Sequence, residues 1–283
     1  MKFTKMHGCG NDYVYVNLFE ETIADPEQLS VAVSDRHFGI GSDGLITIGP
    51  SSVADFRMRM YNADGSEAGM CGNGIRCVAK YVYDHHMTEK SEISVETGAG
   101  VKYLSLDIQD GRVSAVRVDM GEPILAPEQI PVKAQGERVV NEPISVAGRQ
   151  WHMTCVSMGN PHAVIFVENV AEFELEKYGP FFERHERFPE RTNTEFVQVH
   201  SRTEVSMRVW ERGSGETLAC GTGTCATVMA CILNGLTDNR VLVHLRGGDL
   251  TIAYDPDSNH IFMTGPATEV FEGDYSPKLY KIK

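Results

Sequence analysis

Two cysteines stand in matched glycine-rich segments 149 positions apart. The segment Cys71–Gly74 reads Cys-Gly-Asn-Gly, and the segment Cys220–Gly223 reads Cys-Gly-Thr-Gly. Apolar residues at helical spacing follow each segment, so each cysteine is predicted to open a helix. The first N–H groups of a helix lack internal acceptors and carry partial positive charge, and glycines let a ligand come close. Such a helix start binds a carboxylate and lowers the pKa of a neighbouring thiol.

Two such thiols predict inversion at a carbon that bears a carboxylate. One thiolate removes the α-proton, the helix N–H groups stabilise the charge that spreads into the carboxylate, and the opposite thiol returns a proton to the other face. The two sulfurs must therefore rest in opposite protonation states. We expect Cys71 and Cys220 to be catalytic. The N–H groups that open the two helices are expected to hold this carboxylate between them. This chemistry requires no cofactor, and the sequence shows no pattern built for a metal or for pyridoxal phosphate.

The two matched segments belong to a longer repeat in the sequence. The shift of 149 residues lays Met58–Asn62 on Met207–Glu211, and the alignment holds from about residue 10 to about residue 104. A duplicated fold tends to face its two equivalent sites toward each other across a pseudo-twofold axis. We therefore expect an N-terminal repeat over residues 1–120 and a C-terminal repeat over residues 121–265, with the active site in the cleft between them. The tail, residues 266–283, is expected to return to the first repeat.

Short strands dominate the pattern, and each repeat has one strong helix after its cysteine. The predicted helices cover Gly72–His86 and Gly221–Asn234, with shorter ones at Pro26–Arg36 and Phe173–Arg187. The proline-containing segment Glu122–Arg149 is expected to join the repeats. The fold class is therefore α+β, with two pseudo-symmetric repeats, each a mixed, mostly antiparallel sheet or barrel wrapped around a central helix.

Polar residues in matched positions predict how a ligand is held. The register pairs Asn11 with Asn160, Asn62 with Glu211, and Gly44 with Asn193, and these are all candidates for substrate contact except Gly44. The unlike pairs break the symmetry, as a ligand with two unlike ends requires.

Three further features concern charge near the site. Arg212 matches Ala63 and so has no charged counterpart, which predicts a second carboxylate on one side of the ligand. His162 and Glu211 could each set the charge state of a thiol, but the sequence does not choose between that role and simple ligand contact.

Composition narrows the class of protein. A length of 283 residues suits about two domains, and a net charge of −13 without a basic run argues against nucleic acid. No apolar run suits a membrane span or a signal peptide, and seven cysteines show no disulfide spacing, which favours the reduced cytoplasm. Four cysteines outside the two matched segments are expected to be small buried side chains, namely Cys77, Cys155, Cys225 and Cys231. Cys9, beside Gly10 and Asn11, is expected to lie near the pocket without taking part in the chemistry.

Five blocks of this sequence resemble diaminopimelate epimerases. They are Met6–Asp12, Asn62–Glu67, Cys71–Cys77, Gly159–His162 and Glu211–Gly223. The resemblance implies interconversion of LL- and meso-diaminopimelate on the route to lysine and, in bacteria, to peptidoglycan. It also implies a two-cysteine mechanism without cofactor and a cytoplasmic homodimer.

The resemblance assigns roles to individual residues. Cys71 resembles the proton donor and Cys220 the proton acceptor in the LL to meso direction, while His162 and Glu211 resemble the groups that tune the thiols. Arg212 resembles a residue at the distal, non-reacting end of the substrate. Gly72, Asn73, Gly221 and Thr222 resemble the carboxylate cradle at the reacting centre. The other residues that the resemblance implies in substrate binding are Asn11, Asn62, Asn160, Asn193 and Glu211. Many members carry Gln where this chain has Gly44, so that contact is absent here.

The motifs alone, without the resemblance, leave three other functions to consider. A proline racemase of the same architecture is the main alternative, although proline offers no second carboxylate for Arg212. A thiol-redox protein would use Cys71 and Cys220 as a switchable disulfide. A metal-binding module is least favoured, because the cysteine spacings suit no familiar zinc pattern.

Overall fold

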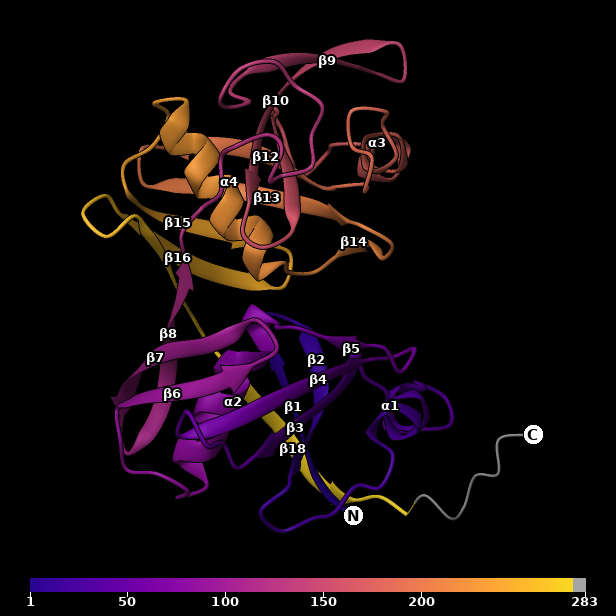
Figure 1. The fold of residues 1–283 in the computed structure, drawn as a ribbon, viewed down its shortest axis with the longest axis vertical. Helices are drawn as coiled ribbons and strands as arrows, with labels where there is room; N and C mark the ends of the chain where they lie inside the picture. Colours follow the sequence, from indigo (N-terminus) through magenta and orange to yellow (C-terminus); the bar gives the residue numbers. More distant parts are fainter. Residues whose placement is uncertain (277–283) are drawn as a thin grey trace. The chain divides into compact units, whose positions relative to one another are not determined.

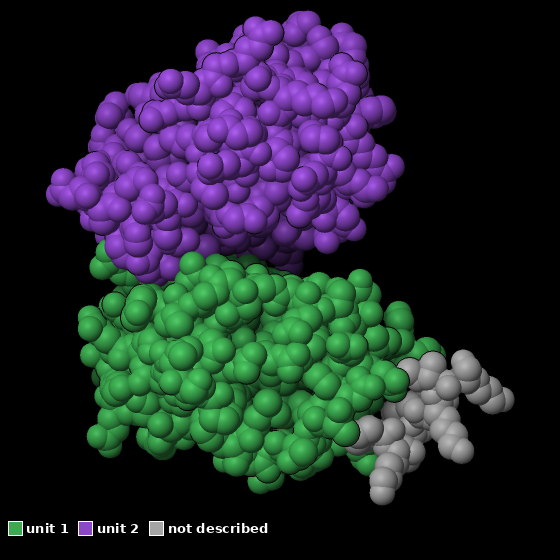
Figure 2. Space-filling view, viewed as in Figure 1, with its two compact units in different colours: residues 1–118, 265–283 green, residues 119–264 purple. Residues whose placement is uncertain are grey.

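The computed structural model describes residues 1–276, and its contacts divide the chain into two units. One unit is Met1–Val118 together with the described residues from Gly265 on, and the other is Asp119–Thr264. Figure 2 colours the first unit green and the second purple. Each unit consists mainly of strands and carries one of the two matched cysteines.

The first unit is a mixed sheet with two helices (Figure 1). The helices are α1 (Pro26–Ser34) and α2 (Gly72–Asp84). The strands are β1 (Lys2–Gly8), β2 (Asn11–Asn17), β3 (Gly44–Gly49), β4 (Phe56–Asn62), β5 (Glu67–Ala68), β6 (Glu92–Thr97), β7 (Gly100–Gln109), β8 (Arg112–Gly121) and β18 (Thr268–Asp274). Most neighbours pair antiparallel, whereas β2 with β3 and β4 with β6 pair parallel.

The second unit has the same plan (Figure 1). Its helices are α3 (Leu175–Glu183) and α4 (Gly221–Leu233). Its strands are β9 (Glu142–Val146), β10 (Arg149–Ser157), β11 (Pro161–Phe166), β12 (Asn193–Ser201), β13 (Glu204–Glu211), β14 (Gly215–Thr217), β15 (Arg240–Leu245), β16 (Gly248–Asp255) and β17 (His260–Gly265). Again two pairs are parallel, β11 with β12 and β13 with β15.

The repeat read from the sequence appears as a repeat of elements. Both bounds of α4 lie 149 positions after those of α2, and α2 follows β4 and β5 as α4 follows the matching strands β13 and β14. The parallel pairs of one unit match those of the other. Both helices are packed inside their sheets, since α2 contacts β1, β2, β7 and β18 and α4 contacts β10 to β13 and β16. The predicted fold class, two mixed sheets each wrapped around a central helix, is confirmed.

One segment behaves differently from the prediction. Residues 122–149 were expected to be a connection, but they fold as part of the second unit. Ile124 forms a bridge with Ser157, and β9 pairs antiparallel with β10. Ile130, Val139 and Ile144 are buried in the core of this unit. The prediction was wrong because it relied on the prolines of this segment. Prolines are tolerated at turns and in edge strands, and burial of several branched apolar side chains stabilises the segment by more than the prolines destabilise it.

The tail adds a strand to the first unit. β18 pairs antiparallel with β1, and it occupies the position that β9 holds beside β10. Residues 277–283, the end of the tail segment considered in the sequence, lie outside the described residues.

Helix bounds differ slightly from the predictions. The helix α2 ends at Asp84, and α3 begins at Leu175 and ends at Glu183. Among residues 1–276, no helix has the length and apolar character needed to cross a membrane.

Candidate active site

Both matched cysteines are the residues that cap the N-termini of the central helices. Cys71 caps α2 with φ −134° and ψ 119°, and Cys220 caps α4 with φ −123° and ψ 111°. The Sγ of Cys71 accepts a hydrogen bond from the N–H of Gly74 at 3.3 Å. The Sγ of Cys220 instead lies 3.6 Å from Thr222 Oγ1. The two thiols therefore have the same backbone setting and different polar partners.

The second glycine of each motif has a packing function. A Cβ at Gly74 would lie 2.5 Å from Ile46 Cδ1. A Cβ at Gly223 would lie 2.5 Å from Glu195 Oε1 and 3.3 Å from Cys220 Sγ. Such distances are far inside van der Waals contact, so a side chain at either position would displace neighbouring groups. In the second unit the displaced groups include the thiol itself.

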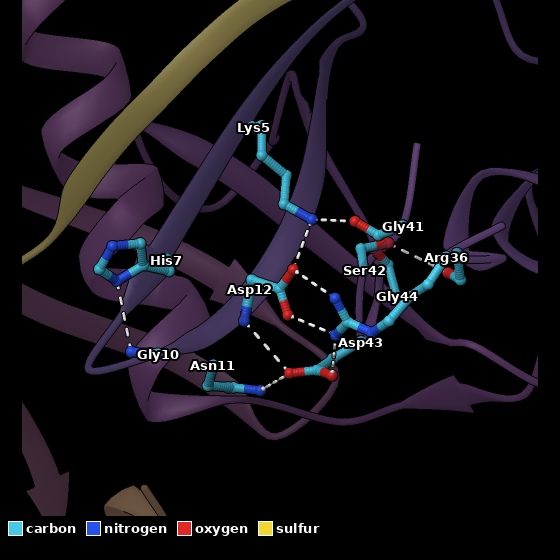
Figure 3. A network of polar contacts seen from close by, with 11 residues as sticks. Lys5, His7, Gly10, Asn11, Asp12, Arg36, Gly41, Ser42, Asp43 and Gly44 are labelled. Atoms are coloured by element: carbon cyan, nitrogen blue, oxygen red, sulfur yellow. Dashed lines mark hydrogen bonds and ion pairs between the residues drawn. The ribbon is translucent and has the colours of Figure 1, made fainter. Parts of the chain in front are cut away.

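Asn11 contacts both the thiol of Cys71 and a network of charged residues, and Figure 3 shows the network. Its Oδ1 lies 3.3 Å from Cys71 Sγ and 3.3 Å from Asn73 Nδ2. Its Nδ2 donates to Asp43 Oδ2 at 2.8 Å, which leaves Oδ1 directed at the thiol. Asp43 is itself held by Arg36, whose Nη2 lies 3.0 Å from Asp43 Oδ1.

The same network includes the residue after Asn11. Asp12 receives two hydrogen bonds from Arg36, at 3.2 and 2.8 Å, and an ion pair from Lys5 at 2.5 Å. Figure 3 shows these side chains converging beside the end of the β1–β2 hairpin. The network thereby fixes the main chain on which Asn11 is carried.

We expect Asp43→Ala to release the Asn11 amide and to reduce kcat/KM about tenfold. One lost hydrogen bond to a charged group is worth on the order of 1.5 kcal/mol, close to a factor of ten in rate. The matched control is Arg36→Met, which keeps the bond between Asp43 and Asn11 and is expected to have a smaller effect. Steady-state kinetics of the two variants check this order, and an Arg36→Met defect larger than that of Asp43→Ala would contradict it.

Arg76 is a buried cation near Cys71 that sequence reasoning missed. It is 0% exposed. Its Nη1 donates to Gly72 O at 3.0 Å, and its Nη2 donates to Asn73 Oδ1 at 2.9 Å. It therefore fixes both residues of the predicted carboxylate cradle of the first unit. The available signal was an arginine on the helix turn that follows the glycines, in a block otherwise made of small and apolar residues.

His162 lies beside a second residue that the sequence analysis did not select. Its Nδ1 is 2.7 Å from Glu195 Oε1, and its Nε2 is 3.0 Å from Asn160 Oδ1. Both His162 and Glu195 are fully buried. The strands explain the meeting, because β11 and β12 run parallel with Val164 opposite Glu195, so that His162 and Glu195 lie on the same face. The signal available in the sequence was a glutamate inside a strand of apolar residues.

Asn193 and Arg212 are joined through the main chain. Asn193 Nδ2 donates to Pro161 O at 2.8 Å, and Asn193 Oδ1 accepts from the N–H of Arg212 at 2.9 Å. The Arg212 side chain is exposed and donates from Nη1 to Glu190 O at 3.0 Å. The side chain of Asn193 therefore fixes the main chain at Arg212.

Glu211 and Asn62 occupy the matched ends of β13 and β4. Glu211 Oε1 accepts a very short hydrogen bond from Thr217 Oγ1. Asn62 Nδ2 donates to Ser66 Oγ at 3.0 Å, and its main chain bonds to Ser66 O at 2.8 Å. Within each unit the structure therefore brings predicted residues together. One group surrounds Cys71 and contains Asn11 and Asn73. The other contains Asn160, His162, Asn193, Glu211, Arg212, Cys220 and Thr222.

The thiol pKa values differ from the expectation that a helix start lowers them. Burial raises the pKa of Cys71, although the N–H groups of Gly74 and Asn73 act in the opposite direction. Burial raises the pKa of Cys220 well above its usual range, and the negative charges of Glu211 and Glu195 add to this. The prediction considered the helix start and not the burial of the sulfur, which is the larger effect.

A raised thiol pKa gives a testable pH dependence. Burial favours the protonated form of both thiols in the free protein, whereas proton abstraction needs one thiolate. We therefore expect kcat/KM to increase from neutral pH into the alkaline range, as the fraction of enzyme with one thiolate grows. A pH–rate profile measured on the folded protein checks the direction, and a profile that already falls on going up from pH 7 would contradict it.

Gly44 and Cys9 both stand where the surrounding structure constrains the chain. A Cβ at Gly44 would lie 2.1 Å from Tyr61 O, so the backbone here has no room for a side chain. Cys9 is buried with φ 52°, and Arg76 Nη2 lies 3.8 Å from its Sγ. The four other cysteines outside the motifs are buried as expected.

Solved structures with the same arrangement of elements define the class of fold. The chain is similar to a phenazine biosynthesis protein of the PhzF family from Bacillus anthracis, with a TM-score of 0.69, 16% identity and coverage of 96% of this chain and 98% of that one. It is also similar to a hydroxyproline epimerase from Agrobacterium vitis, with a TM-score of 0.67, 15% identity and coverage of 96% and 90%. At such identities the likeness shows a shared duplicated fold.

Sequence comparisons narrow the class to one family. The family described as diaminopimelate epimerase matches residues 3–126 and 154–270. The diaminopimelate epimerase of Agathobacter rectalis is 75% identical over 281 residues, covering 97% of this chain and 99% of that protein. The diaminopimelate epimerase of Acetivibrio thermocellus is 60% identical, with coverage of 97% and 98%. This chain belongs to the diaminopimelate epimerase family.

Proposed function

We propose that this protein interconverts LL- and meso-diaminopimelate by inverting one α-carbon. The family membership supports the activity, which makes the protein an isomerase with a small-molecule substrate. The observation that carries the proposed mechanism is the matched pair of thiols, each the N-cap of the central helix of its unit. A mirrored pair of thiols is what an inversion needs, because a proton must leave one face of the carbon and arrive at the other.

In the LL to meso direction, Cys220 acts as the base and Cys71 as the acid. The Cys220 thiolate takes the α-proton, the C–H electron pair moves into the carboxylate, and the Cys71 thiol then gives its proton to the opposite face. In the reverse direction the roles exchange. The charge on the carboxylate is stabilised by the first N–H groups of α2 and α4, at Gly72, Asn73, Gly221 and Thr222. Arg76 supports this role by holding both cradle residues of α2.

The two ends of diaminopimelate meet different groups. Arg212 binds the distal carboxylate, because a guanidinium offers two parallel donors to a carboxylate. The residues proposed to contact the rest of the substrate are Asn11, Asn62, Asn160, Asn193 and Glu211. The position of Arg212, anchored through its N–H to Asn193 and through Nη1 to Glu190, supports this role.

His162 and Glu211 tune the thiols in this proposal. The effect of Glu211 on the pKa of Cys220 supports its part. The reaction as written needs neither a metal nor pyridoxal phosphate, since the thiols and the helix N–H groups supply every step. Cytoplasmic location and assembly as a homodimer are further parts of the proposal, and they follow from the family resemblance.

The decisive experiment offers the purified protein LL-diaminopimelate and proline in separate reactions in heavy water. We expect stereochemical inversion and uptake of solvent deuterium at the α-carbon of diaminopimelate and neither with proline. Inversion of proline alone would instead favour a proline racemase. Absence of any inversion by fully reduced protein would contradict the proposal and would favour a redox role for the two thiols.

A further inference from the structure

Glu195 is an unusual residue in the second unit because its carboxyl group is buried and half unsatisfied. Its side chain is 0% exposed, and its Oε2 has no hydrogen-bond partner among the described residues. Burial raises the pKa of Glu195, and the neighbouring ring of His162 acts in the opposite direction. A buried polar atom without a hydrogen-bond partner destabilises the folded protein, so such an atom indicates a functional role.

The other oxygen of Glu195 shares a proton with His162. Asn160 Oδ1 can only accept, so the contact of 3.0 Å places a proton on His162 Nε2. The contact of 2.7 Å between His162 Nδ1 and Glu195 Oε1 then holds one more proton. That proton can sit on oxygen, giving a neutral acid and a neutral ring, or on nitrogen, giving a carboxylate and an imidazolium. The net charge of the pair is the same in both forms.

The carboxyl group also lies beside the thiol of Cys220. A Cβ at Gly223 would lie 2.5 Å from Glu195 Oε1 and 3.3 Å from Cys220 Sγ. The carboxyl oxygen and the sulfur therefore both face the same small space beside Gly223. A charged Glu195 raises the pKa of Cys220. Because a buried carboxylate and a buried thiolate repel each other strongly, the two cannot both be charged at low cost.

We infer that Glu195 is a positioning residue that matches the protonation of His162 to that of Cys220. The inference rests on the function proposed above. While Cys220 is a thiol, the proton lies on His162 Nδ1 and Glu195 is a carboxylate. When Cys220 gives its proton to the substrate α-carbon, or to solvent in the free protein, the N–H bond at Nδ1 breaks and an O–H bond forms at Glu195 Oε1. The ring and the carboxyl group both become neutral, so that no carboxylate remains beside the new thiolate. Each exchange of roles between the two catalytic thiols is accompanied by this internal proton shift.

The titratable groups that face Glu195 come from four elements. They are Cys155 on β10, His162 on β11, Glu211 on β13 and Cys220 at the start of α4. Burial raises the pKa of Cys155 well above its usual range. Glu211 raises the pKa of Glu195 and of Cys220. Any pH effect of Glu195 must therefore be separated from Glu211, which the variant below leaves in place.

The test is Glu195→Gln, which keeps the shape and keeps an N–H donor for His162 Nδ1 but cannot give up that proton. We expect kcat to fall about 10²-fold, the lower end of what a proton-transfer group contributes, with KM changed less than about threefold. We also expect iodoacetamide to alkylate Cys220 about tenfold faster at a fixed alkaline pH. The rate should rise because Glu195→Gln removes the carboxylate that opposes the Cys220 thiolate. Lowering the pKa of Cys220 by about one unit increases its thiolate fraction about tenfold at a pH below that pKa. Peptide mass spectrometry reports alkylation at Cys220 separately from the other six cysteines.

The matched control is Thr194→Val, at the preceding position of β12. Thr194 is fully buried and its Oγ1 has no hydrogen-bond partner among the described residues, so this isosteric change loses no bond. We expect it to leave both kcat and the Cys220 alkylation rate within about twofold of the parent, the range of a neutral change.

Three results would overturn the inference. They are a Glu195→Gln protein with parental kcat, one with lowered kcat but an unchanged alkylation rate, and equal defects in both variants. The alkylation assay needs no substrate, so it still reads the effect of Glu195 if the parent protein fails to act on diaminopimelate, an outcome that would reject the proposed function instead.

A second measurement on the unaltered protein keeps the test valid if Glu195→Gln does not fold. Infrared difference spectra across the alkaline titration detect protonated carboxyl groups. We expect the protonated-carboxyl band to grow as the Cys220 thiolate forms, opposite to the ordinary behaviour of a carboxyl group on raising the pH. A band that is absent throughout or that only declines would contradict the inference.

Discussion

Replacement of either Cys71 or Cys220 by alanine is expected to reduce kcat about 10⁴-fold while leaving the fold intact. Each thiol supplies one of the two proton transfers, and loss of a positioned acid or base costs up to about this factor. The fold should survive because Cys71 is only partly buried and neither cap is held by more than weak sulfur contacts. Circular dichroism and steady-state kinetics check the two halves of this prediction.

A cysteine from the same helix provides the control. Cys231 is fully buried near the end of α4, away from the helix start. Cys231→Ala is expected to lower the free energy of unfolding by roughly 1 kcal/mol and to leave kcat unchanged. Near-parental turnover of Cys71→Ala or of Cys220→Ala would remove that thiol from the mechanism. An equal loss in Cys231→Ala would show that the effect is structural.

Arg212→Met is expected to reduce kcat/KM about 10²-fold for diaminopimelate. A charge-assisted hydrogen bond to the distal carboxylate is worth roughly 1.5–3 kcal/mol, and each 1.4 kcal/mol is about a factor of ten in rate. The fold should tolerate the change, because the side chain is exposed and donates to a main-chain carbonyl, that of Glu190. Kinetics with LL-diaminopimelate measure the effect.

Two further variants make that measurement specific. Arg202→Met removes another exposed arginine of the same unit, one that pairs with Asp238 at the surface, and is expected to change kcat/KM less than twofold. Arg212→Lys keeps the charge without the two parallel donors and should fall between the parent and Arg212→Met. A full effect of Arg202→Met, or none of Arg212→Met, would contradict a carboxylate contact at Arg212.

The repeat is the part of the fold that the sequence predicted best. A register of 149 residues anticipates the equal spacing of α2 and α4, because a helix opened by Cys-Gly-x-Gly and followed by apolar residues at helical spacing has few alternatives. The same register could not anticipate β9, since the segment 122–149 has no matching copy earlier in the chain. Its prolines suggested a connection, and only the packed unit shows that its apolar side chains are buried.

The site was predicted less completely than the fold. Cys71, Cys220 and Asn11 stand in recognisable motifs, whereas Glu195 and Arg76 are charged residues inside apolar surroundings. Their importance depends on which side chains meet across strands or along a helix. The thiol pKa values show the same limitation. A helix start, which lowers a thiol pKa, is visible in the sequence. Burial of the sulfur, which raises the pKa, depends on how the whole unit packs, and here it is the larger effect.

The most direct test of the central claim follows the hydrogen atom during the first turnovers in heavy water. The account predicts that newly formed meso-diaminopimelate carries one deuterium at the inverted carbon, while the remaining LL-diaminopimelate carries none. This pattern arises because one thiol keeps the substrate proton and the other, equilibrated with solvent, supplies the deuterium. Product that retains the original hydrogen would show that a single group removes and returns the proton, and the assignment of two thiols to opposite faces would be wrong.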